Sequence, residues 1–230
     1  MLWSWRRRLV IPLFDRDMVS MPRPCWAPVP SPEARYRLRD KAQFERYARL
    51  HGLSWFLPAT FDPEAPAVFP AVLKRTDRNS AEGVVVVESL AELRAHRASP
   101  LFAGHPVLLR DIIDDTTDYV THLVAVDGAI VWHVTYAFGL ADGRTTRGPR
   151  NYRSVGASEI SPTEIALFEQ FLRPLAFSGP ANVDFRRRPD GSVAILKINP
   201  RFGLSLLRPE HVADLHAAVG AILAHATLHR

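Results

Sequence analysis

Two turn sequences, each set between β-rich runs, constrain the fold of this chain most strongly. Asp127-Gly128 and Pro189-Asp190-Gly191 each separate two runs rich in β-branched and apolar residues. Asp-Gly is typical of tight hairpins, because both positions tolerate the positive φ that the turn requires. The four runs span residues 119–126, 129–136, 181–187 and 192–199. We therefore expect antiparallel sheet at the centre of the fold.

Helix-forming patterns surround these hairpins. The segment 38–51 carries apolar residues at helical spacing and stops before Gly52. Three further helices are expected, at the capping sequences Ser89-Leu-Ala-Glu92 and Ser161-Pro-Thr-Glu164 and from about Pro209 to the end, with His211, His216 and His225 on the surface of the last. Additional strands are expected at 68–74, 84–87 and 106–113. This mixture, with antiparallel hairpins, indicates an α+β fold.

Three segments are expected to be irregular. Residues 1–36 contain a cluster of prolines that indicates an extended arm. A polar loop is expected at 75–83, and an arginine-rich loop at 139–156. Arg147, Arg150 and Arg153 of the second loop are interpreted as solvated charges, with carboxylate or acyl-phosphate binding by one of them as the alternative.

The composition limits the class of protein. With 230 residues, 47% hydrophobic and 23% charged, the chain can bury a core without disulfides or structural metals. Cys25 is the only cysteine, which excludes an internal disulfide framework and a Cys-rich zinc site. The apolar run 9–14 is interrupted by Pro12 and is too short for a signal peptide or a membrane span. We expect a soluble cytoplasmic protein with no membrane partner.

Lysine is rare in this basic chain. Lys41, Lys74 and Lys197 are the only lysines among 29 basic residues; the rest are arginines. The net charge of +5 permits a nucleotide or a nucleic acid as an anionic partner. Where arginine is the default, a retained lysine marks a position that favours a compact ammonium group. Chance survival of three lysines is the alternative.

The second hairpin carries a polar set. Side chains alternate along a strand, so Asn182 and Asp184 share one face, as do Lys197 and Asn199 of the partner strand. A tight hairpin brings these pairs together, and oxygen atoms of Asp and Asn are ligands that Mg²⁺ prefers. An ordinary solvent-facing side of a sheet would show the same alternation and is the alternative.

Several runs, taken in order, resemble ATP-grasp proteins, the superfamily that includes carbamoyl-phosphate synthetase, biotin carboxylase and D-alanine–D-alanine ligase. The resemblance covers residues 38–207. The runs that carry it are Asp40-Lys41 with Gly52-Leu53 and Pro58, Phe69-Pro-Ala-Val-Leu-Lys74, Ser80-Ala-Glu-Gly83-Val84, Val107-Leu-Leu-Arg110-Asp111-Ile-Ile113, Gly179-Pro-Ala-Asn182-Val-Asp184-Phe, and Ile195-Leu-Lys197-Ile-Asn199-Pro200-Arg201-Phe-Gly203.

The resemblance implies two α+β lobes, with antiparallel sheets, that grip ATP and Mg²⁺. Most such proteins activate a small-molecule carboxylate as an acyl phosphate, which an amine or similar nucleophile then attacks. The implied ATP-binding residues are Lys41 and Lys74 at the phosphates, and Asp111 with the backbone near Ile113 at the ribose and adenine. Asp184 and Asn199 would ligate Mg²⁺, while Arg201 and Lys197 would act at the β- and γ-phosphates.

Position 197 departs from the family pattern. The superfamily motif has Glu where this chain has Lys197, and that Glu bridges two Mg²⁺ ions. An ammonium group cannot ligate Mg²⁺, so either one ion or none accompanies ATP, or the chain is a catalytically impaired nucleotide- or partner-binding protein. The phosphate loop is also unusual, since residues 77–82 contain no glycine and place Asp77 and Glu82 near the phosphates.

The expected organisation is an N-terminal arm at 1–37, an ATP-grasp-like domain at 38–208 with its smaller lobe at about 66–115, and a C-terminal helix at 209–230. Members of the superfamily usually carry an N-terminal domain that helps to bind the second substrate, and we do not expect the arm at 1–37 to form such a domain. A homodimer or a partner subunit would then complete the acceptor site. Nucleic-acid binding through Arg186-Arg187-Arg188 is a third hypothesis, which we rank low because no nucleic-acid motif accompanies these arginines.

Overall fold

The computed structural model describes residues 9–14, 17–18, 29–65, 68–77, 83–113, 115–141 and 152–225. Most of the expected N-terminal arm, including Cys25, lies outside these residues, as do Glu82, Arg147, Arg150 and the side chain of Arg153. Among the helices of the described part, none is long and apolar enough to span a membrane.

A five-stranded antiparallel sheet forms the centre of the larger lobe, with the strand order β7-β6-β5-β8-β9. The strands are β5 (Thr117–Val126), β6 (Ala129–Leu140), β7 (Tyr152–Ser158), β8 (Gly179–Arg187) and β9 (Val193–Asn199). Both predicted hairpins are confirmed. The prediction of a loop over all of 139–156 was wrong, because β6 extends to Leu140 and β7 occupies 152–158, where pairing with a neighbouring strand satisfies the backbone.

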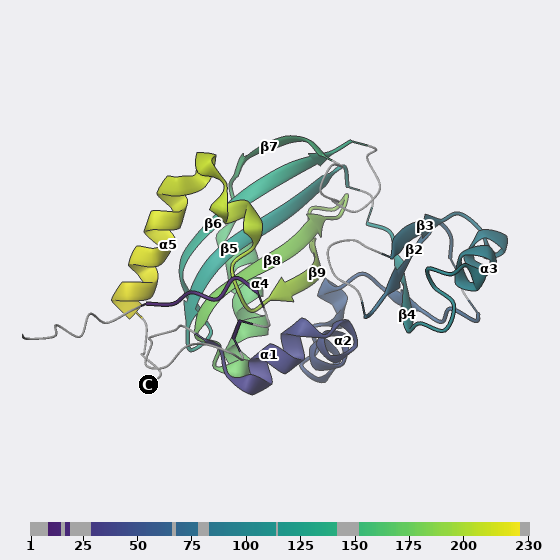
Figure 1. The fold of residues 1–230 in the computed structure, drawn as a ribbon, viewed down its shortest axis with the longest axis horizontal. Helices are drawn as coiled ribbons and strands as arrows, with labels where there is room; N and C mark the ends of the chain where they lie inside the picture. Colours follow the sequence, from purple (N-terminus) through teal and green to yellow (C-terminus); the bar gives the residue numbers. More distant parts are fainter. Residues whose placement is uncertain are drawn as a thin grey trace, which may run out of the picture.

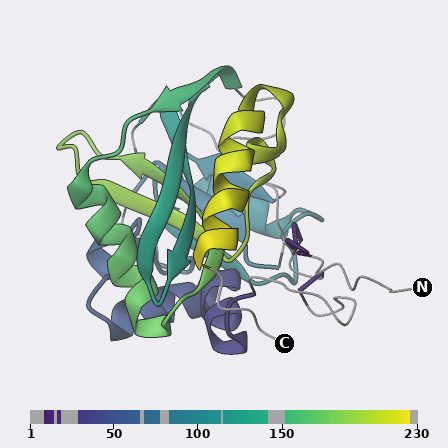
Figure 2. The same cartoon turned by 90° about the vertical axis from the view of Figure 1, so that its left-hand side faces the viewer.

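Helices cover both faces of this sheet (Figures 1 and 2). Helices α1 (Pro32–Arg39), α2 (Lys41–Leu50) and α4 (Pro162–Leu172) pack on one face, around Phe44, Phe168 and Phe185. Helix α5 (Val212–His225) packs on the other face, around Tyr136 and Phe202. Short 3₁₀ turns connect the elements at Ser54–Phe56, Arg173–Leu175, Leu204–Leu207 and Pro209–His211.

The first helical region differs from its prediction. A single helix over 38–51 was expected, but the chain forms α1 and α2 with a break at Asp40, whose carboxylate caps α2 by accepting from the Gln43 N–H at 2.9 Å. Helix α1 starts at Pro32 behind the Ser31 cap, so the expected irregular arm up to residue 36 was wrong at its end. An Ncap hydroxyl followed by Pro at the first helical position explains this early start.

The smaller lobe is a four-stranded sheet with the order β1-β4-β2-β3 and one helix. Its elements are β1 (Thr60–Phe61), β2 (Ala71–Arg75), β3 (Val84–Val87), α3 (Leu90–Ala98) and β4 (Val107–Asp111). Leu73, Leu93 and Phe102 belong to its own buried core. This lobe lies at one end of the molecule, beyond α2 (Figure 1).

A β-bulge in the second hairpin separates its polar and apolar halves. Asp184 pairs with Lys197, but the next pair is Phe185 with Ile195, so Leu196 is the additional residue in β9. Uninterrupted alternation would have placed Ile195 on the face of Lys197. The bulge instead directs Ile195 into the core with Ile198.

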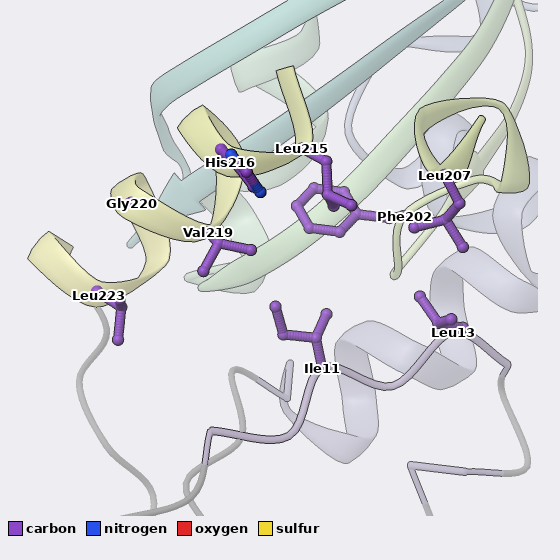
Figure 3. A pocket seen from close by; sticks show the side chains of 9 residues that line it. All are labelled: Ile11, Leu13, Phe202, Leu207, Leu215, His216, Val219, Gly220 and Leu223. Carbon is purple, nitrogen blue, oxygen red and sulfur yellow. The ribbon is translucent and has the colours of Figure 1, made fainter. Parts of the chain in front are cut away.

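An apolar pocket of about 580 Å³ lies between α5 and the segment 9–13 (Figure 3). Its lining is apolar except for His216. The nine lining residues are Ile11, Leu13, Phe202, Leu207, Leu215, His216, Val219, Gly220 and Leu223. Because these nine residues include no lysine or arginine, the pocket is not suited to phosphate binding.

Candidate nucleotide-binding site

The polar set of the second hairpin forms in the predicted register. Asn182 lies directly opposite Asn199, and Asp184 lies directly opposite Lys197. The Asn199 side-chain amide donates from Nδ2 to Asp184 Oδ2 at 3.1 Å. Asn182 and Asn199 are buried, while Asp184 and Lys197 are half-buried. The set faces away from the α1–α2–α4 core, because Val183, Phe185 and Ile198 face into that core.

All three lysines of the chain are brought together where the two lobes meet. Lys41 begins α2, and its Nζ donates to the backbone carbonyl of Arg75 in β2 at 2.6 Å. Lys74 is the neighbour of Arg75 in β2, and Lys197 comes from β9 of the larger lobe. After burial and Arg110, repulsion from Lys41 and Lys197 also lowers the pKa of Lys74, so the three side chains are close enough to interact electrostatically.

The proximity of these cations shifts their pKa values. Burial, followed by repulsion from Lys197 and Arg110, lowers the pKa of Lys41 to about 8. Burial, followed by repulsion from Arg110 and Lys41, lowers the pKa of Lys74 well below its usual range. Burial and the neighbouring cations therefore disfavour the charged form of both lysines. A bound polyanion would favour that form.

Arg110 is a member of this cluster that the sequence reasoning missed. In the pairing of β2 with β4, Val72 lies opposite Arg110 and Lys74 opposite Leu108, so Lys74 and Arg110 share a face of the small sheet. Arg110 is only 2% exposed, and its Nη2 contacts Glu45 Oε2 of α2 at 3.4 Å. Within the described part of the chain, its Nε has no hydrogen-bond partner. The available signal was a single charge within the apolar run 107–110.

Arg201 follows β9 and is half-buried. Its Nη1 donates to the backbone carbonyl of Phe202 at 3.0 Å, which holds the guanidinium near the end of the strand. The structure thus places Arg201 two residues beyond the end of β9, the strand that carries Lys197.

Asp111 and Ile113 lie at the connection between the lobes. Asp111 ends β4, and its N–H donates to the carbonyl of Ala59 at 2.8 Å. The carbonyl of Ile113 accepts from the Asp115 N–H at 2.9 Å and from Arg186 Nη1 at 3.0 Å. That carbonyl therefore stabilises the connection. Because it already accepts two hydrogen bonds, it is not available to accept another from a nucleotide.

Asp77 is neutralised by an intramolecular partner. Its carboxylate accepts from Arg75 Nε at 2.8 Å and from Arg75 Nη2 at 2.6 Å, and the paired guanidinium lowers the pKa of Asp77. Gly83 makes room for this pair, since a Cβ there would lie 2.9 Å from Arg75 Cδ. The charge of Asp77 is thus compensated inside the small lobe, although residues 78–82 of the predicted phosphate loop lie outside the described residues.

A histidine–serine contact extends the polar face toward α5. His122 in β5 lies opposite Asn182, is fully buried, and has its Nε2 2.8 Å from Ser205 Oγ. The Gly203 N–H donates to His122 Nδ1 at 3.3 Å. His211 was expected on the surface of the last helix. It lies instead in the 3₁₀ turn before α5 and is half-buried; its ring stacks on Tyr136 at 3.8 Å and its Nδ1 lies 2.8 Å from the Ser205 carbonyl.

The run Arg186-Arg187-Arg188 is used within the fold. Arg186 forms a buried ion pair with Asp118 at 2.6 Å. Arg187 pairs with Glu164 at 2.8 Å, and Arg188 donates to the carbonyl of Val193 at 2.8 Å. These intramolecular contacts account for the three adjacent arginines without a nucleic acid.

The donor set does not fit a pair of Mg²⁺ ions. Asp184 is the one carboxylate in the polar set, and it already accepts from Asn199, while Lys197 stands opposite it. Nowhere in the described ranges do three or more His, Cys, Asp or Glu side chains gather to hold a metal ion. Mg²⁺ needs oxygen ligands, preferably carboxylates, and an ammonium group repels it.

Comparison with solved structures identifies the fold. The biotin carboxylase of Campylobacter jejuni, solved in complex with β,γ-ATP, matches with a TM-score of 0.67 and 12% identity, over 86% of this chain and 50% of that one. The biotin carboxylase domain of the Hydrogenobacter thermophilus 2-oxoglutarate carboxylase, solved with MgADP, ADP and bicarbonate, matches with a TM-score of 0.63 and 12% identity, over 87% and 49%.

D-alanine–D-alanine ligase from Bacillus anthracis matches with a TM-score of 0.60 and 16% identity, over 87% of this chain and 71% of that one. The chain thus has the ATP-grasp fold, which confirms the α+β prediction. It spans about half the length of the two carboxylase structures. No protein-family profile matches the sequence, and no curated protein sequence matches it significantly.

Proposed function

We propose that this chain binds ATP between its lobes and acts as an ATP-dependent ligase, which activates a carboxylate for attack by an amine or a similar nucleophile. The observation that carries the proposal is the convergence of Lys41, Lys74, Arg110 and Lys197 from four different elements. Cations that are partly buried and mutually repelling are poised to bind an anion with several negative charges.

The proposed roles follow the positions of the side chains. Lys41 and Lys74 bind phosphate oxygens from α2 and β2, and Arg110 contributes a buried charge beside them. Arg201 offers the planar guanidinium that can hold a phosphate through two parallel hydrogen bonds. Asp111 is proposed to accept from the ribose hydroxyls. At Ile113 the proposed contact with adenine is through the N–H, because the carbonyl is already used.

The proposed chemistry transfers the γ-phosphoryl group to the carboxylate. A carboxylate oxygen bonds to the γ-phosphorus as the bond to the ADP oxygen breaks, giving an acyl phosphate and ADP. The nucleophile then bonds to the acyl carbon, and inorganic phosphate leaves with the bonding electron pair. The contribution of the protein is positioning and neutralisation of phosphate charge, for which the lysines and arginines described above are suited.

Binding of the second substrate is proposed to involve a partner subunit or a second copy of the chain. The chain covers about half of the two carboxylase structures described above, one of which is a domain dimer. We propose a cytoplasmic location, since ATP and small-molecule carboxylates are available there.

One observation favours a second candidate function. Lys197 stands where the superfamily motif has a metal-bridging Glu. The alternative is a nucleotide-binding protein on the same fold that no longer turns ATP over. Both candidates predict that the chain binds ATP, but only the first predicts that it converts ATP to ADP.

The test is ADP release from ATP in the presence of hydroxylamine, which traps an acyl phosphate as a hydroxamate, over a panel of carboxylates. The expected result is hydroxamate formation that Lys74→Met abolishes and that Arg94→Gln, an exposed change on α3, leaves unchanged. ATP binding without turnover for any carboxylate would establish the second candidate. Failure to bind ATP at all would overturn both.

A further inference from the structure

Three cationic groups of other elements lie in the electrostatic environment of Lys197. Lys41, Lys74 and Arg110 interact with one another, and Lys197 acts on both other lysines. The carboxylate of Glu45 contacts Arg110 at 3.4 Å, and that of Asp77 is held by Arg75 at 2.6 Å. These two carboxylates are therefore matched by guanidinium groups, while Asp40 and Asp77 also act on Lys41.

The hairpin side of the cluster offers little to a divalent cation. Asp184 accepts from the Asn199 amide at 3.1 Å, and the residue directly opposite Asp184 is Lys197. A cation bound to Asp184 would thus lie opposite Lys197, which also acts electrostatically on Lys41 and Lys74. Such an arrangement penalises Mg²⁺ and favours the oxygens of a polyphosphate.

We infer that this site binds the phosphates of a nucleoside triphosphate without a divalent metal ion, the side chain of Lys197 supplying positive charge from β9. The inference rests on the proposed function, because it concerns the same phosphate site. It specifies the ligand form as the free nucleotide anion, not its Mg²⁺ complex.

A site without a metal ion and a site that binds the Mg²⁺ complex respond to Mg²⁺ with opposite changes in their affinity for ATP. Mg²⁺ lowers the negative charge of ATP in solution, so a site that relies on its own cations loses attraction when the metal is added. A site that relies on a bound metal gains attraction under the same conditions. Titrations of ATP with excess EDTA and with excess Mg²⁺ therefore distinguish the two kinds of site.

The experiment measures the Kd of ATP calorimetrically for the full chain in both conditions, with inorganic tripolyphosphate as a second probe that lacks adenine and ribose. Three variants accompany the wild type. Lys197→Glu reverses the charge and restores the acidic residue of the superfamily motif, and Lys197→Met removes the charge with similar length. Arg94→Glu reverses an exposed charge on α3 and controls for the net charge of the protein.

The expected result is that the wild type binds ATP in EDTA at least as tightly as in Mg²⁺. Lys197→Glu and Lys197→Met should weaken binding in EDTA by about tenfold or more, and Mg²⁺ should restore part of the affinity in Lys197→Glu alone. Arg94→Glu should change the Kd by less than about threefold. Circular dichroism of each variant verifies that it is folded.

Two outcomes overturn the inference and are distinguishable. Wild-type binding that requires Mg²⁺, with Kd about tenfold or more weaker in EDTA, overturns it and leaves the proposed nucleotide site intact. The absence of ATP and tripolyphosphate binding in both conditions overturns the proposed function as well. The Kd values of the wild type in EDTA and in Mg²⁺ test the inference even if a variant of Lys197 fails to fold.

Discussion

Lys41 Nζ donates a hydrogen bond of 2.6 Å to the backbone carbonyl of Arg75. This contact joins the first residue of α2, on the large lobe, to the last residue of β2, on the small lobe. It holds one ammonium group close to Lys74, the neighbour of Arg75, and near Lys197. The electrostatics of the proposed phosphate site therefore depend on how the two lobes are joined.

The depressed pKa of Lys41, about 8, predicts that ATP binding takes up protons. A bound polyanion favours the ammonium form and raises this pKa, so affinity is fully developed below pH 8 and falls as the pH rises above it. The charged groups that act on Lys41 are Lys197 and Arg110, which lower its pKa, and Asp77 and Asp40, which raise it. Calorimetry at pH 8 in buffers of different ionisation enthalpy measures the uptake.

The variants for this prediction keep or remove the titrating group. Lys41→Arg carries a permanent charge and should reduce the uptake, while the exposed Arg46→Gln on the same helix should not. An uptake that is equal in the wild type and Lys41→Arg would contradict the assignment to Lys41. A residual uptake is expected from Lys74, whose pKa burial also lowers.

Loss of the Glu45 carboxylate should destabilise the protein. Arg110 is 2% exposed and contacts Glu45 at 3.4 Å, so Glu45→Gln leaves a buried guanidinium without its counter-charge. The expected decrease in the free energy of unfolding is about 3 kcal/mol, measured by urea denaturation. The control is Glu33→Gln, which breaks an exposed pair with Arg37 and should cost about 0.5 kcal/mol or less. Equal effects in the two variants would show that the Arg110 pair contributes nothing particular.

The Asp118–Arg186 pair should be needed for folding stability. Its Nε–Oδ1 distance is 2.6 Å and both side chains are buried, and Arg186 also donates to the Ile113 carbonyl between the lobes. Asp118→Asn should lower the free energy of unfolding by about 3 kcal/mol. The partly exposed pair Arg208–Glu210, tested as Glu210→Gln, should cost far less. A thermal melt in which Asp118→Asn matches the wild type would refute this role.

Alanine substitutions at two glycines with nearly equal positive φ distinguish the cost of backbone strain from the cost of steric crowding. Gly128 has a φ of +82° and Gly191 a φ of +81°, but a Cβ at Gly128 would lie 2.4 Å from the Arg173 Cα, whereas one at Gly191 would meet nothing within 4 Å. Gly191→Ala should cost about 1–2 kcal/mol from φ alone. Gly128→Ala should cost about 2–4 kcal/mol, since the backbone of the 3₁₀ turn after α4 must also move. Equal costs would contradict the close approach.

Local signals in the sequence determined much of the secondary structure. The Asp127-Gly128 turn specifies a hairpin through two positive φ angles, and Ser161 with Glu164 forms the predicted capping box. At Ser89 the prediction is met in part, because Glu92 reaches the Glu88 N–H and not that of Ser89. Such signals are readable because they act over four residues or fewer. The ends of elements were read less well, as α1 and β7 show, because pairing partners and caps outside the segment decide them.

The sequence by itself determined the residue types, the order of the motifs and the rarity of lysine, and hence the three lysines of the candidate site. Only the tertiary structure decided that Arg110 and Glu45 join them, that a bulge at Leu196 turns Ile195 into the core, and that His122 contacts Ser205. The physical reason is the sequence separation of the residues in contact. These contacts join residues 65 or more positions apart, or depend on a register that local propensity does not encode.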